Sequence, residues 1–86
     1  TYTEENLHGD WSIQIGAFTS RERTENALTK TLNLLPPSLS TAKSRIAPLR
    51  TAQGWIYRGR FEGYSKAAAK DACSLLPDCI ALAPLK

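Results

Sequence analysis

The sequence contains no methionine, one histidine and two cysteines among its 86 residues. The histidine, His8, lies in a polar stretch at the start of the chain, so no serine or cysteine of the rest has an imidazole base beside it. A glycine-rich phosphate loop and the spacing of a zinc site are also absent. These absences argue against catalysis, and we expect a binding module without catalytic residues, metal or cofactor.

Long apolar runs are missing as well. No stretch approaches the ~20 apolar residues of a membrane span, and no basic segment followed by an apolar one resembles a signal peptide. We therefore expect no membrane contact by this domain, and we interpret the chain, which starts without methionine, as a domain excised from a longer protein. Residues 1–9 are polar and acidic and are predicted to be a linker or tail, and residues 10–86 a single domain.

Acidic residues are absent from the middle of the chain. Between Glu25 and Glu62 there is none, although six basic residues fall there. They are Lys30, Lys43, Arg45, Arg50, Arg58 and Arg60. This balance favours an anionic partner or one rich in hydrogen-bonding groups.

The first half of the chain reads as a strand followed by a helix. From Trp11 to Gly16 apolar and polar residues alternate with a period of two, which is typical of a strand with one buried face. Ser20 can cap a helix over residues 21–35, where apolar residues recur at helical spacing. Pro36 and Pro37 end that helix, because neither can donate the next backbone hydrogen bond.

The second half repeats this order after an added strand. Residues 43–50 read as a strand interrupted by Pro48, which should lie at an edge of the sheet or be bulged near Pro48. A short turn leads into a strand at 55–61 that should pair with it. Ser65 caps a predicted helix over 66–76, and residues 79–84 supply the last strand. The predicted fold is an α+β ferredoxin-like βαββαβ arrangement, with a four-stranded antiparallel sheet, two helices on one face and the other face open.

The open face is where we expect function. If Ile13 and Ile15 face the helices, Ser12 and Gln14 face outward, and the same alternation turns Arg58 and Arg60 outward on the neighbouring central strand. Trp55 falls at the margin, beside the hairpin turn. An amide and guanidinium groups together suit a polymer with hydroxyl and amide groups, and they also suit phosphates or stacked bases.

The two cysteines, Cys73 and Cys79, leave two interpretations open. They form a disulfide if the domain works outside the cytoplasm, and they are two separate buried thiols if it does not.

The sequence also resembles a known protein family. The run Trp11-Ser-Ile-Gln-Ile-Gly-Ala-Phe18, with its degenerate repeat at Tyr57–Tyr64, resembles the SPOR domain across residues 10–84. The cysteine-bearing end resembles a variant found as the C-terminal module of some envelope proteins, including peptidoglycan hydrolases of the carboxypeptidase class. The sequence departs from the family at Ala17, where serine is frequent, and at Gly59, where a branched apolar residue is usual.

The resemblance implies a monomeric periplasmic module. It would bind peptidoglycan glycan strands stripped of their stem peptides and bring its parent protein to the division septum. The family's sheet-face glutamine, arginine and tryptophan fall on Gln14, Arg58 and Trp55. An extra residue before Gly63 leaves open which face of the sheet Trp55 occupies. The expected glycan-binding residues are Ser12, Gln14, Ala17, Trp55, Arg58 and Arg60. A periplasmic location also favours the disulfide.

One alternative is a protein-interaction or dimerising ferredoxin-like domain without a ligand, for which a large apolar open face would be expected. The main alternative is a single-stranded nucleic-acid-binding module, because RNA-recognition modules share this fold and use the open sheet. Those modules stack bases on aromatic residues of the central strands, whereas Tyr57 and Phe61 have inward parity here. We therefore expect no nucleic-acid partner.

Overall fold

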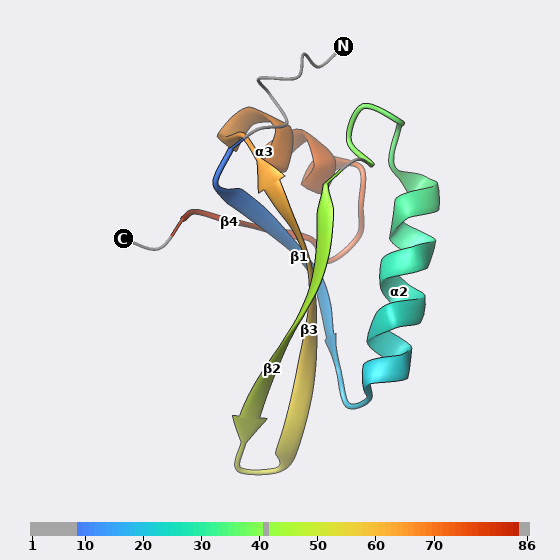
Figure 1. Ribbon diagram of the computed structural model, residues 1–86, viewed down its shortest axis with the longest axis vertical. Coiled ribbons are helices and arrows are strands. Elements are labelled where there is room, and N and C mark those ends of the chain that lie inside the picture. Colours follow the sequence, from blue (N-terminus) through green and yellow to red (C-terminus); the bar gives the residue numbers. More distant parts are fainter. Residues whose placement is uncertain (1–8, 41, 85–86) are drawn as a thin grey trace.

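A computed structural model of the chain describes residues 9–40 and 42–84, and it confirms the predicted fold class. Four strands form one antiparallel sheet in the order β2-β3-β1-β4, and two helices connect them (Figure 1). The elements are β1 (Trp11–Phe18), α2 (Arg21–Leu34), β2 (Lys43–Thr51), β3 (Gly54–Tyr64), α3 (Lys66–Ser74) and β4 (Ile80–Leu82). Neither helix of the described part is long and apolar enough to cross a membrane.

Both helices begin at the predicted serine caps. The Ser20 hydroxyl accepts a hydrogen bond of 3.1 Å from the backbone N–H of Arg23, and the Ser65 hydroxyl accepts one of 3.2 Å from Ala68. The first helix ends where Leu35 bonds to the carbonyl of Thr31 and Pro36 prevents a further turn.

A single core lies between the helices and one face of the sheet, so both helices cover the same face. Its members from α3 are alanines, which carry only a methyl group and let that helix lie close to the strands. At its centre the buried Tyr64 hydroxyl donates a hydrogen bond of 2.7 Å to the carbonyl oxygen of Leu39. The buried core residues are Ile13, Leu28, Leu35, Leu39, Phe61, Tyr64, Ala68, Ala69 and Ala72.

Several details of the strands differ from the prediction. Pro48 does not interrupt β2, because an edge strand has an outer side where a missing N–H removes no ladder bond. The last strand is shorter than residues 79–84, since only Ile80–Leu82 pair with β1. Residues 1–8 of the predicted tail lie outside the described residues, while the N–H of Gly9 bonds to the carbonyl of Gly63 at 3.1 Å.

Candidate functional site

The two central strands, β1 and β3, set the geometry of the open face. Their register pairs Ser12 with Glu62, Gln14 with Arg60 and Ala17 with Arg58. Partners in an antiparallel ladder share a face, and the alternating residues Ile13 and Phe61 are buried against the helices. Five of the predicted site residues, Ser12, Gln14, Ala17, Arg58 and Arg60, therefore share the face that the helices leave uncovered.

A β-bulge at Ile15 brings Ala17 onto this face. The pairing skips one residue between Gln14 and Gly16, so two residues of β1 oppose one of β3. Strict alternation would turn Ala17 toward the helices and Phe18 toward solvent. Because of the bulge, Ala17 points to the open face and Phe18 points toward the helices. A Cβ added at Gly16 would lie 2.9 Å from the Phe18 ring, so the glycine leaves room for that ring. Strict alternation along the sequence does not predict this bulge.

The Nε of Arg60 donates a hydrogen bond of 3.2 Å to Oε1 of Gln14, across the central pair of strands. The Nε of Arg58 donates one of 3.1 Å to the carbonyl oxygen of Ala47 on β2. Both guanidinium groups are thus fixed through Nε, which leaves their terminal nitrogens available as donors. The open face therefore carries two guanidinium groups whose orientations are fixed by hydrogen bonds.

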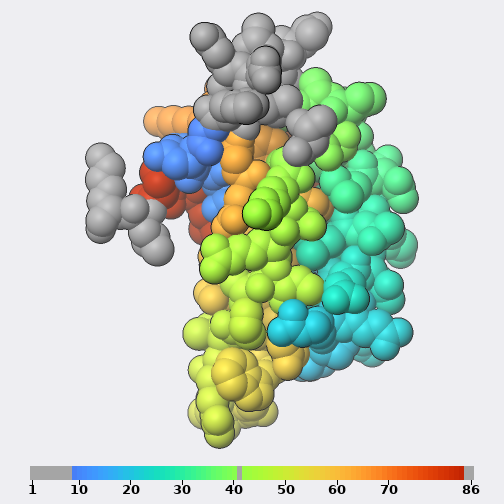
Figure 2. Space-filling model, in the orientation of Figure 1, coloured from blue at the N-terminus to red at the C-terminus, as the bar shows by residue number. Residues whose placement is uncertain are grey.

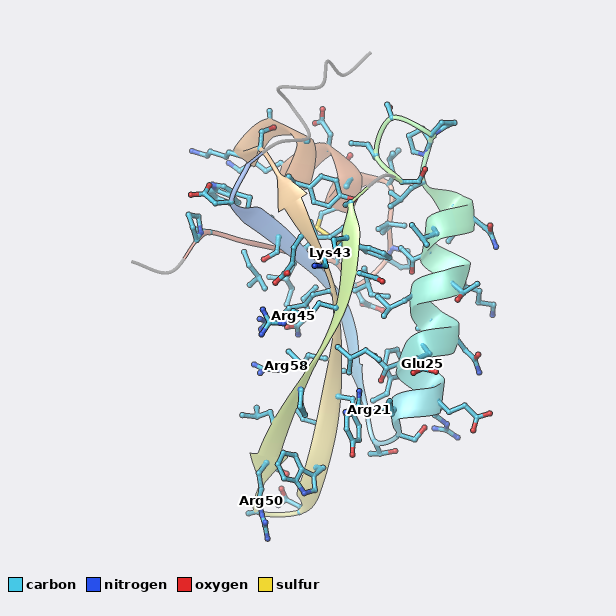
Figure 3. All side chains as sticks on the ribbon, in the orientation of Figure 1. Arg21, Glu25, Lys43, Arg45, Arg50 and Arg58 are labelled. Atoms are coloured by element: carbon cyan, nitrogen blue, oxygen red, sulfur yellow. A yellow bond between two sulfur atoms is a disulfide. The ribbon has the colours of Figure 1, made fainter. Side chains whose placement is uncertain are left out.

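Positive charge dominates this face. In Figure 3, Arg45 and Arg58 extend from the side of the sheet away from α2. Arg45 pairs with Arg60 in the β2–β3 register and also contacts the Glu62 carboxylate at 3.2 Å. Partial burial, followed by the charges of Arg58 and Arg45, lowers the pKa of Arg60, and Glu62 acts in the opposite direction. An anion bound on this face would oppose the effect of Arg58 and Arg45 on Arg60, in the same direction as Glu62.

A shallow depression of about 330 Å³ lies on the same face. It crosses all four strands, and its polar lining combines two arginines, Arg45 and Arg60, with Ser12 and the carboxylates of Asp10 and Glu62. The lining is completed by Leu82, Ala83 and Pro84. An elongated ligand can lie across it, with polar groups toward the arginines and apolar surface toward β4.

The structure does not bring Trp55 to this face. Trp55 pairs with Arg50, whose guanidinium carbon lies 5.8 Å from the indole centroid. Trp55 and Tyr57 are two residues apart on β3, so their side chains point to the same face of the sheet. The guanidinium of Arg21, on α2, lies 5.2 Å from the centroid of the Tyr57 ring. The indole is 49% exposed and lies on the helix-bearing side of the hairpin, near its tip.

A disulfide between Cys73 and Cys79 anchors the start of β4, the strand whose Leu82 lines the depression on the open face. It joins the C-terminal end of α3 to the residue before β4, with the two Cα atoms 5.0 Å apart. Because β4 pairs with only Ser12, Ile13 and Gln14, this covalent link is a principal restraint on Leu82, which lies opposite Ser12.

Sequence reasoning missed Arg45, Glu62 and Leu82 as neighbours of the site. Arg45 and Glu62 could have been found by extending the alternation from Arg60, along β3 to Glu62 and across the ladder to Arg45. Leu82 had no such signal, because its position depends on how the short β4 aligns with β1.

Comparison with known proteins identifies no relative. No family model, curated protein or solved structure matches this chain.

Proposed function

We propose that the open face binds peptidoglycan glycan strands and that the domain is a non-catalytic targeting module. The observation that carries this proposal is the hydrogen bond between Arg60 and Gln14 beside a second fixed guanidinium, that of Arg58. The paired amide and the two oriented guanidinium groups offer hydrogen-bond donors at set positions on the open face. The resemblance to the SPOR domain supports the same ligand.

The chemistry of a glycan without stem peptides fits this surface. Its lactyl groups end in carboxylates, which can accept two parallel hydrogen bonds from Arg58 or Arg60. Its hydroxyl and acetamide groups suit Gln14, which can donate through Nε2 while its Oε1 accepts from Arg60. Apolar sugar faces can pack on Leu82 and Ala17, since the Trp55 indole lies on the other side of the sheet.

The Cys73–Cys79 disulfide is typical of proteins from oxidising compartments outside the cytoplasm. Within the proposal, that compartment is the periplasm and the glycan is the denuded strand of the division septum. The domain then localises its parent protein there and works as a monomer.

Cosedimentation with sacculi tests this function. We expect the 86-residue chain to pellet with sacculi, and to pellet about tenfold more tightly after an amidase has removed the stem peptides. Arg58→Ala should reduce binding to the treated sacculi, whereas Arg23→Ala, which removes an exposed arginine of α2, should not. Equal binding to treated and untreated sacculi would contradict the preference for denuded glycan.

Single-stranded nucleic acid is the competing ligand class. The outward positions of β1 and β3 within the described chain hold no aromatic side chain on which bases could stack. We therefore expect labelled oligonucleotides to bind only through charge, with affinity that falls steeply as salt rises. Tight, salt-resistant oligonucleotide binding would overturn the glycan proposal.

A further inference from the structure

The second surface that invites a ligand is the outer edge of β2. This strand ends the sheet, and no strand among residues 9–40 and 42–84 pairs with its outer side. Figure 2 shows this edge at the front of the molecule with α2 beside it. An exposed edge strand presents unpaired backbone donors and acceptors, which makes it a template for an added strand.

Pro48 identifies which backbone groups face outward. The β2–β3 pairing runs without interruption from Lys43 to Thr51, although Pro48 has no N–H to donate. Pro48 therefore occupies a position whose N–H would point away from β3. Because these positions alternate along an antiparallel strand, the N–H and C=O groups of Ser44 and Ile46 also point outward. The free edge offers both donors and acceptors.

A groove of about 390 Å³ runs beside this edge, between β2 and α2. Leu28, Leu32 and Ile46 supply its apolar floor. Arg21 and Glu25 of α2 lie on the groove side of the sheet in Figure 3 and contribute to its polar rim. An apolar side chain from an added strand would enter this groove, since such a strand sends alternate side chains to each face.

The other face of an added strand would meet positive charge. Lys43 and Arg45 share the open-face parity of Glu62 and Arg60, and β2 contains no acidic residue. A second copy of β2 paired edge to edge would add two further cations and no carboxylate to this face, so a second copy of this chain does not complement the charge of the site. A strand with acidic residues opposite Lys43 and Arg45 does.

We propose that the β2 edge is a docking site for an extended peptide segment of another protein, in which acidic and apolar residues alternate. The segment adds a fifth strand beside Ser44 and Ile46. Its apolar side chains fill the groove against α2, and its carboxylates face Lys43 and Arg45. Main-chain hydrogen bonds supply affinity and the alternating pattern supplies selectivity. This surface shares Arg45 with the depression on the open face, but it includes neither Gln14 nor Arg60 of the proposed glycan site.

Nuclear magnetic resonance with a synthetic probe tests the proposal. The probe is a blocked peptide of sequence Glu-Val-Glu-Val-Glu-Val-Glu, and its control replaces every glutamate by lysine. The acidic peptide should shift the backbone amide signals of Ser44 and Ile46 and slow their exchange with solvent about tenfold, as new hydrogen bonds do. The basic peptide should leave both signals unchanged.

Two substitutions at one position separate strand pairing from unspecific charge attraction. Ser44→Pro removes an outward N–H without removing a ladder bond and should weaken the acidic peptide about tenfold. Ser44→Val keeps the N–H and should bind it within about twofold of the unchanged chain. Both variants should still sediment with amidase-treated sacculi. If Ser44→Pro does not fold, two modified acidic peptides serve in its place, one N-methylated on every valine and the other on every glutamate. Only one of these two sets of N–H groups faces β2 in an added strand, so one peptide should lose binding and the other should keep it.

Several results would overturn the proposal. These are unchanged Ser44 and Ile46 signals with the acidic peptide, equal binding of the basic peptide, and undiminished binding by Ser44→Pro or by both methylated peptides.

Discussion

The Nε of Arg60 on β3 and Oε1 of Gln14 on β1 lie 3.2 Å apart and join two residues that are 46 positions apart in the sequence. The bond orients both side chains. It fixes the guanidinium plane of Arg60, and it directs the amide nitrogen of Gln14 away from that bond. A ligand on the open face therefore meets a preformed pair of polar groups.

Gln14→Ala should weaken both stability and binding. The substitution removes the acceptor of Arg60 and one ligand-facing amide, so we expect the free energy of unfolding to fall by about 1 kcal/mol and glycan affinity to fall about tenfold. Urea denaturation and cosedimentation measure the two effects. Asn26→Ala removes an exposed amide from α2 and should lower neither quantity, because alanine favours the helix. Full binding by a folded Gln14→Ala chain would contradict the site assignment.

Gly59 is predicted to tolerate no branched side chain. A Cβ at this position would lie 3.2 Å from Thr24 Cγ2 and 3.3 Å from Leu28 Cδ2, so α2 approaches β3 closely here. Gly59→Val should lower the free energy of unfolding by about 2 kcal/mol through overpacking. The exposed change Leu49→Val should alter it by less than about 0.5 kcal/mol. Equal stability of the two variants in urea would show that α2 can move aside without cost.

Reduction of the Cys73–Cys79 disulfide should loosen β4. The disulfide joins cysteines with a sequence separation of 6 and so closes a short loop. It stabilises the fold by about 2 kcal/mol, because it lowers the conformational entropy of the unfolded chain. With reductant, we expect lower thermal stability and faster amide exchange where β4 pairs with β1. The double variant Cys73→Ser, Cys79→Ser should behave like the reduced chain and should not respond to reductant. A reductant effect in that variant would mean that the reagent acts elsewhere.

The buried phenol of Tyr64 predicts a loss of stability at alkaline pH. Burial raises its pKa from 10.0 to about 12 in the folded chain. Between these values the unfolded chain has released the proton and the folded chain retains it, so stability falls as the pH rises through this window, by about 3 kcal/mol in all. Tyr64→Phe has no such proton. Urea denaturation at several pH values should show the free energy of unfolding of the unchanged chain falling toward that of Tyr64→Phe as the pH rises. If the free energies of the two chains keep a constant difference across this pH range, the pKa shift of Tyr64 is contradicted.

Much of this architecture could be predicted, because alternation and capping are local signals. Ser20 and Ser65 identify both helix starts, and the period of two around Gln14 and Arg60 assigns these residues to the open face before any pairing is known. Such signals are determined within a few residues of the chain. The fold class follows from their order.

The remaining features depend on contacts between distant segments. The bulge at Ile15 accompanies the packing of Phe18 beside α2. Gly16 is its one local signal, but a glycine at this point is equally consistent with the end of a strand, so the sequence does not decide between the two. The side of the sheet that Trp55 occupies depends on the register of the β2–β3 hairpin. The extent of β4 depends on pairing with Ser12 and Gln14, so its sequence suggested a longer strand than the structure contains.

Chemical-shift mapping with soluble denuded glycan fragments tests the central claim most directly. We predict that the backbone and side-chain signals of Ser12, Gln14, Arg58 and Arg60 shift together and saturate with a single affinity. Signals of Asn26 and Lys30, on the outer surface of α2, should stay unchanged. Shifts centred on α2 or on Trp55, with Gln14 and Arg60 unaffected, would contradict the account.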